Sequence, residues 1–250
     1  MLAHRGLVNF AQAFAQDLEV GPGSRSLQFA SISFDASVAE IFTALLAGAT
    51  LCLAPRETLA SIPELTQLLQ QQAVTTATLP PAVWELLDPT TLTTLQTAVS
   101  AGEACPPQVA QRWSPSRRFF NAYGPTEASI GVAWYPVPAG KEWKTAVPIG
   151  KAIANTQLYI LDKLGRPVPV GIPGELHIGG VGLAKGYLNR PELTAERFVS
   201  LSVIGNPLSV NHSLLTAHRS PTTVYRTGDL CRFLPDGNIE FLGRIDDQVK

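Results

Sequence analysis

The sequence has few cysteines, almost no net charge and no long apolar run. Cys52, Cys105 and Cys231 are scattered, with no C-x-x-C pair and no histidine at ligand spacing. This favours buried thiols in a reduced compartment over a disulfide framework or a structural metal site. The formal net charge is −1 and no Lys/Arg block occurs, so no nucleic-acid partner is expected. No stretch approaches the ~20 apolar residues of a membrane span, and the N-terminus lacks a signal-peptide pattern. These absences predict a cytoplasmic protein without a membrane partner.

What the chain does contain is enough apolar sequence for a sizeable core. Of its 250 residues, 45% are hydrophobic and 16% charged, which is typical of a folded globular protein. From about residue 25 to 135, β-prone runs alternate with stretches of helical periodicity. This alternation predicts an α/β fold with a doubly wound, mostly parallel sheet. The predicted strands are 26–31, 50–54, 74–79, 95–100 and 117–123, and the predicted helices lie around 38–46, 62–69, 82–87 and 107–113.

The second half has a different texture, with short strands separated by glycine, proline and aspartate turns. It predicts a barrel-like, antiparallel β region. We therefore expect two units, an α/β part over residues 1–140 and a smaller β-rich subdomain over residues 141–250. The strands expected here are 158–161, 174–178, 224–226 and 238–242, with an exposed loop over 200–223.

The most informative motif is the heptad Asn-Ala-Tyr-Gly-Pro-Thr-Glu at residues 121–127. It follows the apolar pair Phe119-Phe120 at the predicted carboxyl end of a strand, where parallel sheets place their ligand clefts. Its amide, ring, hydroxyl and carboxylate suit the edge of a base, the face of a base, a phosphate and a metal ion. The heptad thus predicts a nucleotide site, although a plain turn explains it equally well.

Two aspartates follow predicted strands, and each has two interpretations. In Phe-Asp-Ala-Ser, either Asp35 or Ser37 caps the helix that follows, or Asp35 pairs with an ammonium group at the floor of a pocket. Asp229, in Tyr-Arg-Thr-Gly-Asp-Leu, either stabilises a Gly-Asp turn or accepts hydrogen bonds from both hydroxyls of a ribose. The glycine-rich stretch 174–188 is interpreted as a hairpin-like scaffold, and residues 243–250, taken alone, as a solvated tail.

In this order, the five segments 34–37, 121–127, 174–188, 225–230 and 243–250 resemble the core motifs of the adenylation domains of nonribosomal peptide synthetases. These domains belong to the adenylate-forming, AMP-binding superfamily, with acyl-CoA ligases and luciferases. The resemblance extends over essentially the whole chain. It implies an ATP-dependent ligase of secondary-metabolite biosynthesis that forms aminoacyl-AMP, releases pyrophosphate and loads a carrier's phosphopantetheine thiol. The implied partners are an amino acid and the peptidyl carrier and condensation domains of a multidomain synthetase.

The resemblance also implies a role for individual residues. Those implied to bind ATP and its Mg²⁺ are Asn121 (adenine edge), Tyr123 (adenine face), Thr126 (α-phosphate), Glu127 (Mg²⁺), Asp229 (ribose hydroxyls) and Arg244 (beside Asp229), with Gly102 and Ala122 in the same site. Thr126 and Glu127 are the implied catalytic residues, and Asp246 is the implied hinge. The residue types agree with this chemistry, since a hard cation on a carboxylate neutralises phosphates.

Asp35 matches the family residue that pairs with the α-ammonium group of an amino acid. The implied side-chain pocket is formed by Ala36, Ala39, Thr78, Val99, Ala101, Ala122, Ile130 and Gly131. None is charged, so an apolar or aromatic amino acid is expected, because a charged one would be left unpaired. The small Ala39 and Gly131 leave room and favour a bulky, phenylalanine- or tyrosine-like side chain.

Two parts of the family's active site are expected outside these 250 residues. The glycine-rich loop that grips the triphosphate would precede residues 4–6, and the subdomain with the bridging lysine would follow Lys250. Loss of one preorganised cation costs on the order of 3–4 kcal/mol, by analogy with oxyanion-site deletions. We therefore expect negligible amino-acid-dependent ATP–pyrophosphate exchange from the isolated chain. Two alternatives stay open: an acyl- or aryl-CoA ligase fragment, against which Asp35 argues, and a non-catalytic nucleotide-binding remnant.

Overall fold

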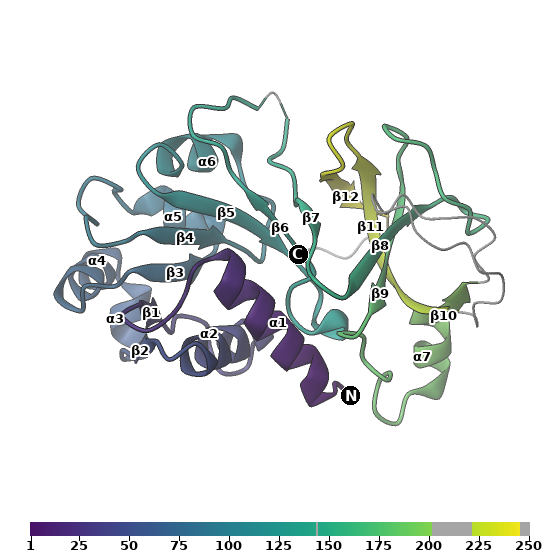
Figure 1. Ribbon diagram of the computed structural model, residues 1–250, viewed down its shortest axis with the longest axis horizontal. Helices are drawn as coiled ribbons and strands as arrows, with labels where there is room; N and C mark the ends of the chain where they lie inside the picture. The colour runs from purple at the N-terminus through teal and green to yellow at the C-terminus, as the bar shows by residue number, and fades with distance from the viewer. Residues whose placement is uncertain (144, 202–221, 246–250) are drawn as a thin grey trace.

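The computed structural model describes residues 1–143, 145–201 and 222–245. Two sheets lie side by side, an α/β unit and a β unit (Figure 1). The first has seven strands in the order β2-β1-β3-β4-β5-β6-β7, and the second has five antiparallel strands. The predicted fold class, a mostly parallel α/β sheet followed by a smaller antiparallel β region, is confirmed.

The α/β unit follows the predicted alternation of strand and helix. Its helices are α1 (His4–Asp17), α2 (Asp35–Leu46), α3 (Arg56–Ala60), α4 (Ile62–Gln71), α5 (Pro81–Leu86) and α6 (Pro107–Trp113). Its strands are β1 (Arg25–Leu27), β2 (Thr50–Cys52), β3 (Thr76–Leu79), β4 (Thr97–Ser100), β5 (Arg118–Tyr123), β6 (Ala133–Pro136) and β7 (Lys151–Ala152). Strands β1 to β5 run parallel, and β6 and β7 are added antiparallel.

In the β unit, β11 is the central strand. It pairs with β9 on one edge, and with β10 and then β12 along the other. The strands are β8 (Thr156–Leu161), β9 (Gly174–Gly180), β10 (Phe198–Leu201), β11 (Thr222–Phe233) and β12 (Ile239–Arg244), and the helix is α7 (Pro191–Arg197). The ends of the predicted loop 200–223 are therefore strand residues, and the rest of it lies outside the described residues.

Three differences from the predicted elements matter for the site. The helices α1 and α7 were not predicted, although Phe10 and Phe14 of α1 have helical spacing and are buried. The strand expected over 26–31 ends at Leu27, because the backbone beyond it bonds to a buried glutamate instead. Only the first arm of the expected hairpin 174–188 is a strand, because after β9 the chain leaves the sheet and runs to α7 without a second strand.

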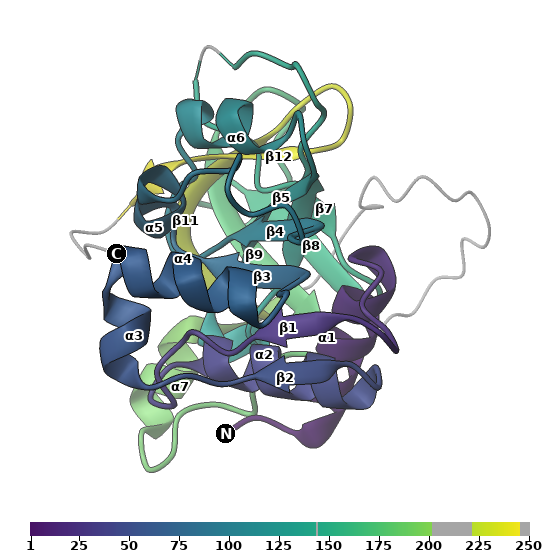
Figure 2. The same cartoon turned by 90° about the vertical axis from the view of Figure 1, so that its left-hand side faces the viewer.

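Helices cover both faces of the first sheet, as a doubly wound fold requires. On one face Phe119 packs with Trp84 of α5 and Trp113 of α6. On the other face Val99 and Phe120 pack against α1 and α2. Viewed from the side, α4 and α5 lie on one side of the strands and α1 on the other (Figure 2). Alternate residues of β4 and β5 thus face the two opposite hydrophobic cores. The carboxyl ends of these strands lie between the two helical layers, where doubly wound sheets bind their ligands.

The apolar stripe of α2 does not face the core. Phe42, Leu45 and Leu46 are 41%, 58% and 59% exposed, whereas the buried positions are Ser37, Glu40, Thr43 and Ala44. The small residues Ser37, Thr43 and Ala44 allow α2 to pack closely against the elements next to it. The buried Glu40 carboxylate accepts hydrogen bonds from backbone N–H groups there. Periodicity shows which residues share a face of a helix, but not which face is covered.

All three cysteines are buried, as predicted, and their thiols are free. Within the described ranges, no helix combines the length and the hydropathy that a membrane crossing requires.

Candidate functional site

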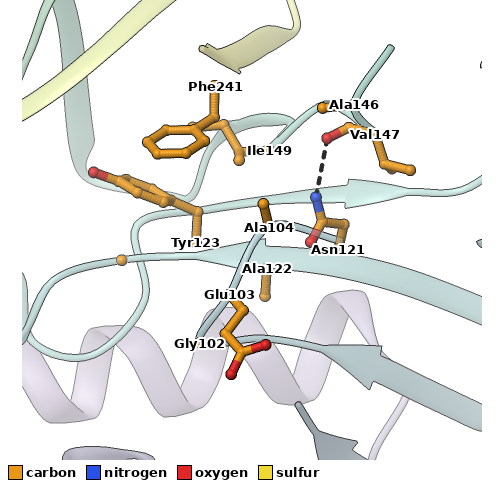
Figure 3. A pocket seen from close by; sticks show the side chains of 11 residues that line it. Gly102, Glu103, Ala104, Asn121, Ala122, Tyr123, Ala146, Val147, Ile149 and Phe241 are labelled. Atoms are coloured by element: carbon orange, nitrogen blue, oxygen red, sulfur yellow. Dashed lines mark hydrogen bonds between the residues drawn. The ribbon is translucent and has the colours of Figure 1, made fainter. Parts of the chain in front are cut away.

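A pocket opens at the carboxyl ends of β4 and β5, facing the second sheet (Figure 3). The loop after β4 forms one wall, the first half of the heptad the floor, and the strip leading to β7 the opposite wall. Phe241 of β12 completes the pocket from the other sheet. The lining residues are Gly102, Glu103, Ala104, Asn121, Ala122, Tyr123, Gly124, Ala146, Val147, Ile149 and Phe241. The heptad therefore lies where parallel sheets bind ligands.

The side-chain amide of Asn121 is held in one orientation. It is 2% exposed, and its Nδ2 donates hydrogen bonds to the carbonyl oxygens of Val147, at 3.2 Å, and Pro148, at 2.9 Å. Both amide hydrogens are used by these two bonds. Asn121 can therefore offer a ligand in the pocket only an acceptor, its oxygen Oδ1.

Tyr123 connects the first sheet to the second. Its ring lies beside Ile149 and Phe241 in the pocket wall (Figure 3), and its hydroxyl donates to Oδ2 of Asp229 on β11. Burial, together with the Asp229 carboxylate, raises the pKa of the Tyr123 phenol well above its usual value. The phenol therefore stays protonated and acts as a donor. The two predicted nucleotide residues, 106 positions apart, are in direct contact.

Asp229 is 3% exposed and is also bound by a cation. Arg244 Nη1 donates to its Oδ1 at 3.1 Å and to the carbonyl oxygen of Thr227 at 3.0 Å. A buried carboxylate needs such compensation, because an unpaired charge in this position would be costly. The structure thus brings together Tyr123, Asp229 and Arg244, while the predicted hinge Asp246 lies outside the described residues.

The glycine of the heptad is required by a close backbone approach. A Cβ on Gly124 would lie 2.3 Å from the carbonyl oxygen of Ile130, since the chain doubles back after the short 3-10 helix η1 (Thr126–Ala128). Ser129 and Ile130 complete the reversal with positive φ angles of 62° and 77°. Non-glycine residues in this region are strained, and such strain is frequent at functional sites. The reversal presents Thr126 and Glu127 together on η1.

Thr126 is in contact with Asp35, which comes from the start of α2. The Thr126 hydroxyl donates to Asp35 Oδ2 at 2.6 Å. The capping interpretation of Asp35 is wrong, because the N-cap residue of α2 is Phe34 and the helix start has no side-chain cap. Ser37 does not cap it either, since its hydroxyl donates to the Phe34 carbonyl oxygen. Asp35, which is predicted to bind an ammonium group, thus contacts Thr126, the residue directly before the predicted metal ligand Glu127.

Glu127 has a partner that sequence reasoning missed. The hydroxyl of Tyr187 donates to its Oε1 at 2.6 Å. Burial, followed by the hydrogen bond to Glu127, raises the pKa of the Tyr187 phenol far above its usual value, so it too is a donor. Tyr187 belongs to the stretch interpreted as scaffold. The only signal in the sequence was a tyrosine within a glycine-rich run, which does not reveal a contact 60 residues away.

Most residues of the implied side-chain pocket lie on the face of the sheet covered by α1 and α2. Four of them, Ala39, Val99, Ala122 and Ile130, pack with the rings of Phe10, Phe14 and Trp134. Thr78 pairs with Val99 in register, and Ala36 and Ala101 are half-buried. A Cβ on Gly131 would lie 2.5 Å from Cε2 of Phe10, so the Phe10 ring fills the space next to this glycine.

A second buried carboxylate, on Glu40 of α2, holds the segment that leads to Asp35. Glu40 is 8% exposed, and its oxygens accept the backbone N–H groups of Phe29, at 3.0 Å, and Ala30, at 3.1 Å, and the side chain of Gln28, at 3.1 Å. These bonds replace the strand pairing that ends at Leu27. Burial raises the pKa of Glu40 to about 7, although the three hydrogen bonds lower it in part.

The raised pKa makes the stability contribution of Glu40 depend on pH. Between the unfolded pKa of 4.5 and the folded pKa of about 7, the folded state retains a proton that the unfolded state has released, so stability falls as the pH rises through this window. The difference in unfolding free energy between the native protein and Glu40→Gln should decrease by roughly 3 kcal/mol over this range. Denaturant unfolding of both proteins at several pH values measures it, and a difference independent of pH would contradict the assignment.

Comparisons with known proteins agree with this geometry. A family model described as AMP-binding enzyme matches residues 1–188. Bacitracin synthase 3 of Bacillus licheniformis is 47% identical over 251 aligned positions, which cover 100% of this chain but 4% of that protein. Gramicidin S synthase 1 of Brevibacillus brevis is 44% identical, with 100% and 21% covered. The chain thus spans a small part of the length of these curated relatives.

Solved structures share the fold. The nonribosomal peptide synthetase FmoA3 (S1046A) in its α-methyl-L-serine-AMP-bound form has a TM-score of 0.86 and 35% identity, covering 99% of this chain and 27% of that one. Its AMPPNP-bound form gives 0.85 and 35%, covering 97% and 26%. NpsA-ThdA, an artificially fused adenylation-PCP di-domain from Klebsiella oxytoca, gives 0.84 and 29%, covering 97% and 47%. Because the family model matches well over half of the residues, the chain belongs to the AMP-binding enzyme family.

Proposed function

We propose that this chain forms the nucleotide- and amino-acid-binding face of an ATP-dependent adenylating ligase. The reaction joins an amino-acid carboxylate to ATP, giving aminoacyl-AMP and pyrophosphate, for loading of a carrier-protein thiol in nonribosomal peptide synthesis. One observation carries the proposal: Thr126 donates to Asp35 at 2.6 Å, next to Glu127. A carboxylate suited to an ammonium group, a hydroxyl suited to a phosphate and a carboxylate suited to a metal ion thus share one corner.

The nucleotide is held by the pocket between the sheets. The Oδ1 of Asn121 accepts the exocyclic N–H of adenine, and it would repel guanine, which carries an acceptor oxygen at that position. The Tyr123 ring lies against the face of the base. Asp229, oriented by Tyr123 and Arg244, accepts the ribose hydroxyls. The base and the ribose then fix the α-phosphorus near Thr126, and Gly102 and Ala122 leave space for the nucleotide.

The chemical step is a displacement at the α-phosphorus. A carboxylate oxygen of the amino acid attacks phosphorus, and the bond from phosphorus to the bridging oxygen breaks, so that pyrophosphate leaves with the bonding electrons. Asp35 pairs with the α-ammonium group and orients the attacking carboxylate. The ammonium group replaces Thr126 as the donor to Asp35, and the Thr126 hydroxyl then donates to the α-phosphate, where charge accumulates in the transition state.

The residues at this corner fit a Mg²⁺ ion. Magnesium in nucleotide enzymes is usually bound by one or two carboxylates together with substrate phosphates and water, not by a protein cage. The half-buried Glu127 supplies one carboxylate, and no cluster of three or more His, Cys, Asp or Glu ligands occurs in the described parts of the chain. When bound, the ion would neutralise the phosphate charge against which the carboxylate must attack.

The substrate is proposed to be an apolar or aromatic amino acid. The residues around Val99 and Ile130 are uncharged and pack among aromatic rings, so a charged side chain there would lack a partner. The similarity to NpsA-ThdA, an adenylation-PCP fusion, supports a carrier domain as a partner, and a condensation domain is proposed as a further one. Residues 1–140 and 141–250 are proposed as the two units, although β7 pairs with the first sheet.

The test is amino-acid-dependent ATP–pyrophosphate exchange by the full-length protein that carries this chain. Apolar and aromatic amino acids should support exchange, and the matching carboxylic acids without an α-amino group should support far less. Exchange that prefers the amine-free acids would instead assign an acyl or aryl ligase. If neither class supports exchange, while the protein still binds ATP, the non-catalytic alternative is correct.

A further inference from the structure

The glycine-rich stretch interpreted as scaffold makes direct contacts with the proposed catalytic corner. After β9 the chain crosses η1 as a segment that we name the clamp, residues 182–187. Its Ala184 N–H donates to the carbonyl oxygen of Glu127 at 2.8 Å, and its Gly182 carbonyl oxygen accepts the Ser129 hydroxyl at 2.6 Å. A Cβ on Gly182 would lie 2.7 Å from the Ala128 carbonyl oxygen, so the clamp touches η1 along its backbone.

The last residue of the clamp reaches the carboxylate itself. Tyr187 donates its hydroxyl to Oε1 of Glu127 at 2.6 Å. The buried Tyr225 side chain interacts with the same carboxylate, so two phenols of the β unit surround it. The Tyr187 ring packs edge-on against Phe198, with centroids 5.7 Å apart, and Phe198 packs on Tyr225 at 5.2 Å. The phenol is therefore positioned by rings of the second sheet, while the carboxylate belongs to the first unit.

The backbone of Tyr187 is fixed as well. Its N–H donates to Thr194 Oγ1 at 2.9 Å, and the Thr194 hydroxyl donates to the Arg190 carbonyl oxygen at 2.8 Å. Gly186 adopts a φ of 129° against Thr194, a conformation that strains any other residue. Helix α7, which carries Thr194, thus holds the phenol in place.

We propose that Tyr187 is a positioning residue for Glu127, holding its carboxylate in the orientation in which it meets the metal ion of the nucleotide. The inference rests on the proposed function, because it assumes that Glu127 is the metal ligand. Groups that orient a metal ligand raise metal affinity without touching the metal, and their loss typically costs tenfold to a hundredfold. Through this contact the β unit sets the geometry of a residue in the α/β unit.

The test measures metal binding directly. Mn²⁺ replaces Mg²⁺ as a spectroscopic probe, and its binding to the full-length protein with AMPPNP is titrated by electron paramagnetic resonance. Tyr187→Phe, which keeps the ring but removes the hydroxyl, should weaken Mn²⁺ binding by about tenfold. Glu127→Gln should weaken it more, and Tyr159→Phe, which removes a phenol from β8 in the same sheet, should leave it unchanged. The exchange rate of Tyr187→Phe should return toward the native rate at high Mg²⁺.

The outcomes separate the inference from the function. Unchanged Mn²⁺ affinity in Tyr187→Phe, with a loss in Glu127→Gln, overturns the inference and leaves the function intact. A lower exchange rate that excess Mg²⁺ does not restore also overturns it, since it indicates a structural role only. Unchanged affinity in both variants overturns the metal site and the inference together. If Tyr187→Phe fails to fold, Thr194→Val replaces it, with a smaller weakening expected and unchanged affinity again counting against the inference.

Discussion

Replacing Asp35 with alanine should abolish most amino-acid activation. The expected loss in kcat/KM for the amino acid is on the order of a hundredfold to a thousandfold. Removing one partner of a desolvated charge pair costs about 2–5 kcal/mol, much of it the penalty of leaving the other charge unpaired. Asp35 is the partner proposed for the substrate ammonium group, and it accepts a hydrogen bond from Thr126. The measurement is ATP–pyrophosphate exchange over a range of amino-acid concentrations.

The matched control is a change of substrate. The same carboxylic acid without its α-amino group should be activated by the native protein and by Asp35→Ala at similar low rates, since neither can form the pair. The KM for ATP should change little, because the adenine pocket lies around Asn121 and Tyr123. A variant that loses activity equally with both substrates would show that Asp35 serves the fold of the corner, not recognition of the amine.

Replacing Glu127 with glutamine should lower the exchange rate on the order of a hundredfold to a thousandfold at saturating amino acid. The isosteric amide can still accept the Tyr187 hydroxyl, but it is a poor ligand for a hard cation. Polarisation of the phosphate by the ion is worth several kcal/mol of transition-state stabilisation, and this contribution would be lost. Exchange kinetics measured over a range of Mg²⁺ concentrations provide the check.

Two controls make the result specific. Glu192→Gln removes an exposed carboxylate on the first turn of α7 and should leave the exchange rate unchanged. Binding of ATP without metal should be similar in the native protein and in Glu127→Gln, whereas the gain in affinity on adding Mg²⁺ should be present only in the native protein. An unaltered Mg²⁺ dependence in Glu127→Gln would place the metal ion elsewhere.

The local sequence pattern was enough to predict that the heptad lies at the carboxyl end of a strand. Phe119 and Phe120 form a buried strand, and Gly124 ends it because a side chain there would strike the Ile130 carbonyl oxygen. A strand followed by a glycine bend can be recognised from the local sequence. Because ligands bind at the carboxyl ends of parallel strands, this strand end is predicted to be a binding site. The positions of Asp35 and Asp229 follow from the same rule and from the resemblance.

The remaining contacts depend on distant parts of the chain. Tyr187 contacts Glu127 because the segment between β9 and α7, which is not a strand, crosses η1. The hydrophobic periodicity of the sequence, which predicts helices and strands, gives no sign of that crossing. The burial of Glu40 was likewise hidden, since a glutamate among apolar helical residues normally faces solvent. Its burial becomes favourable only when the backbone N–H groups of Phe29 and Ala30 converge on it.

A crystal structure of the full-length protein with a non-hydrolysable aminoacyl-AMP analogue would test the proposed roles of Asp35, Asn121 and Tyr123 together. We expect the α-amino group of the analogue within hydrogen-bonding distance of Asp35 and its adenine in the pocket against Tyr123, with the exocyclic nitrogen donating to Asn121 Oδ1. An analogue bound with its amine away from Asp35, or with its base outside this pocket, would show that the proposed function is wrong.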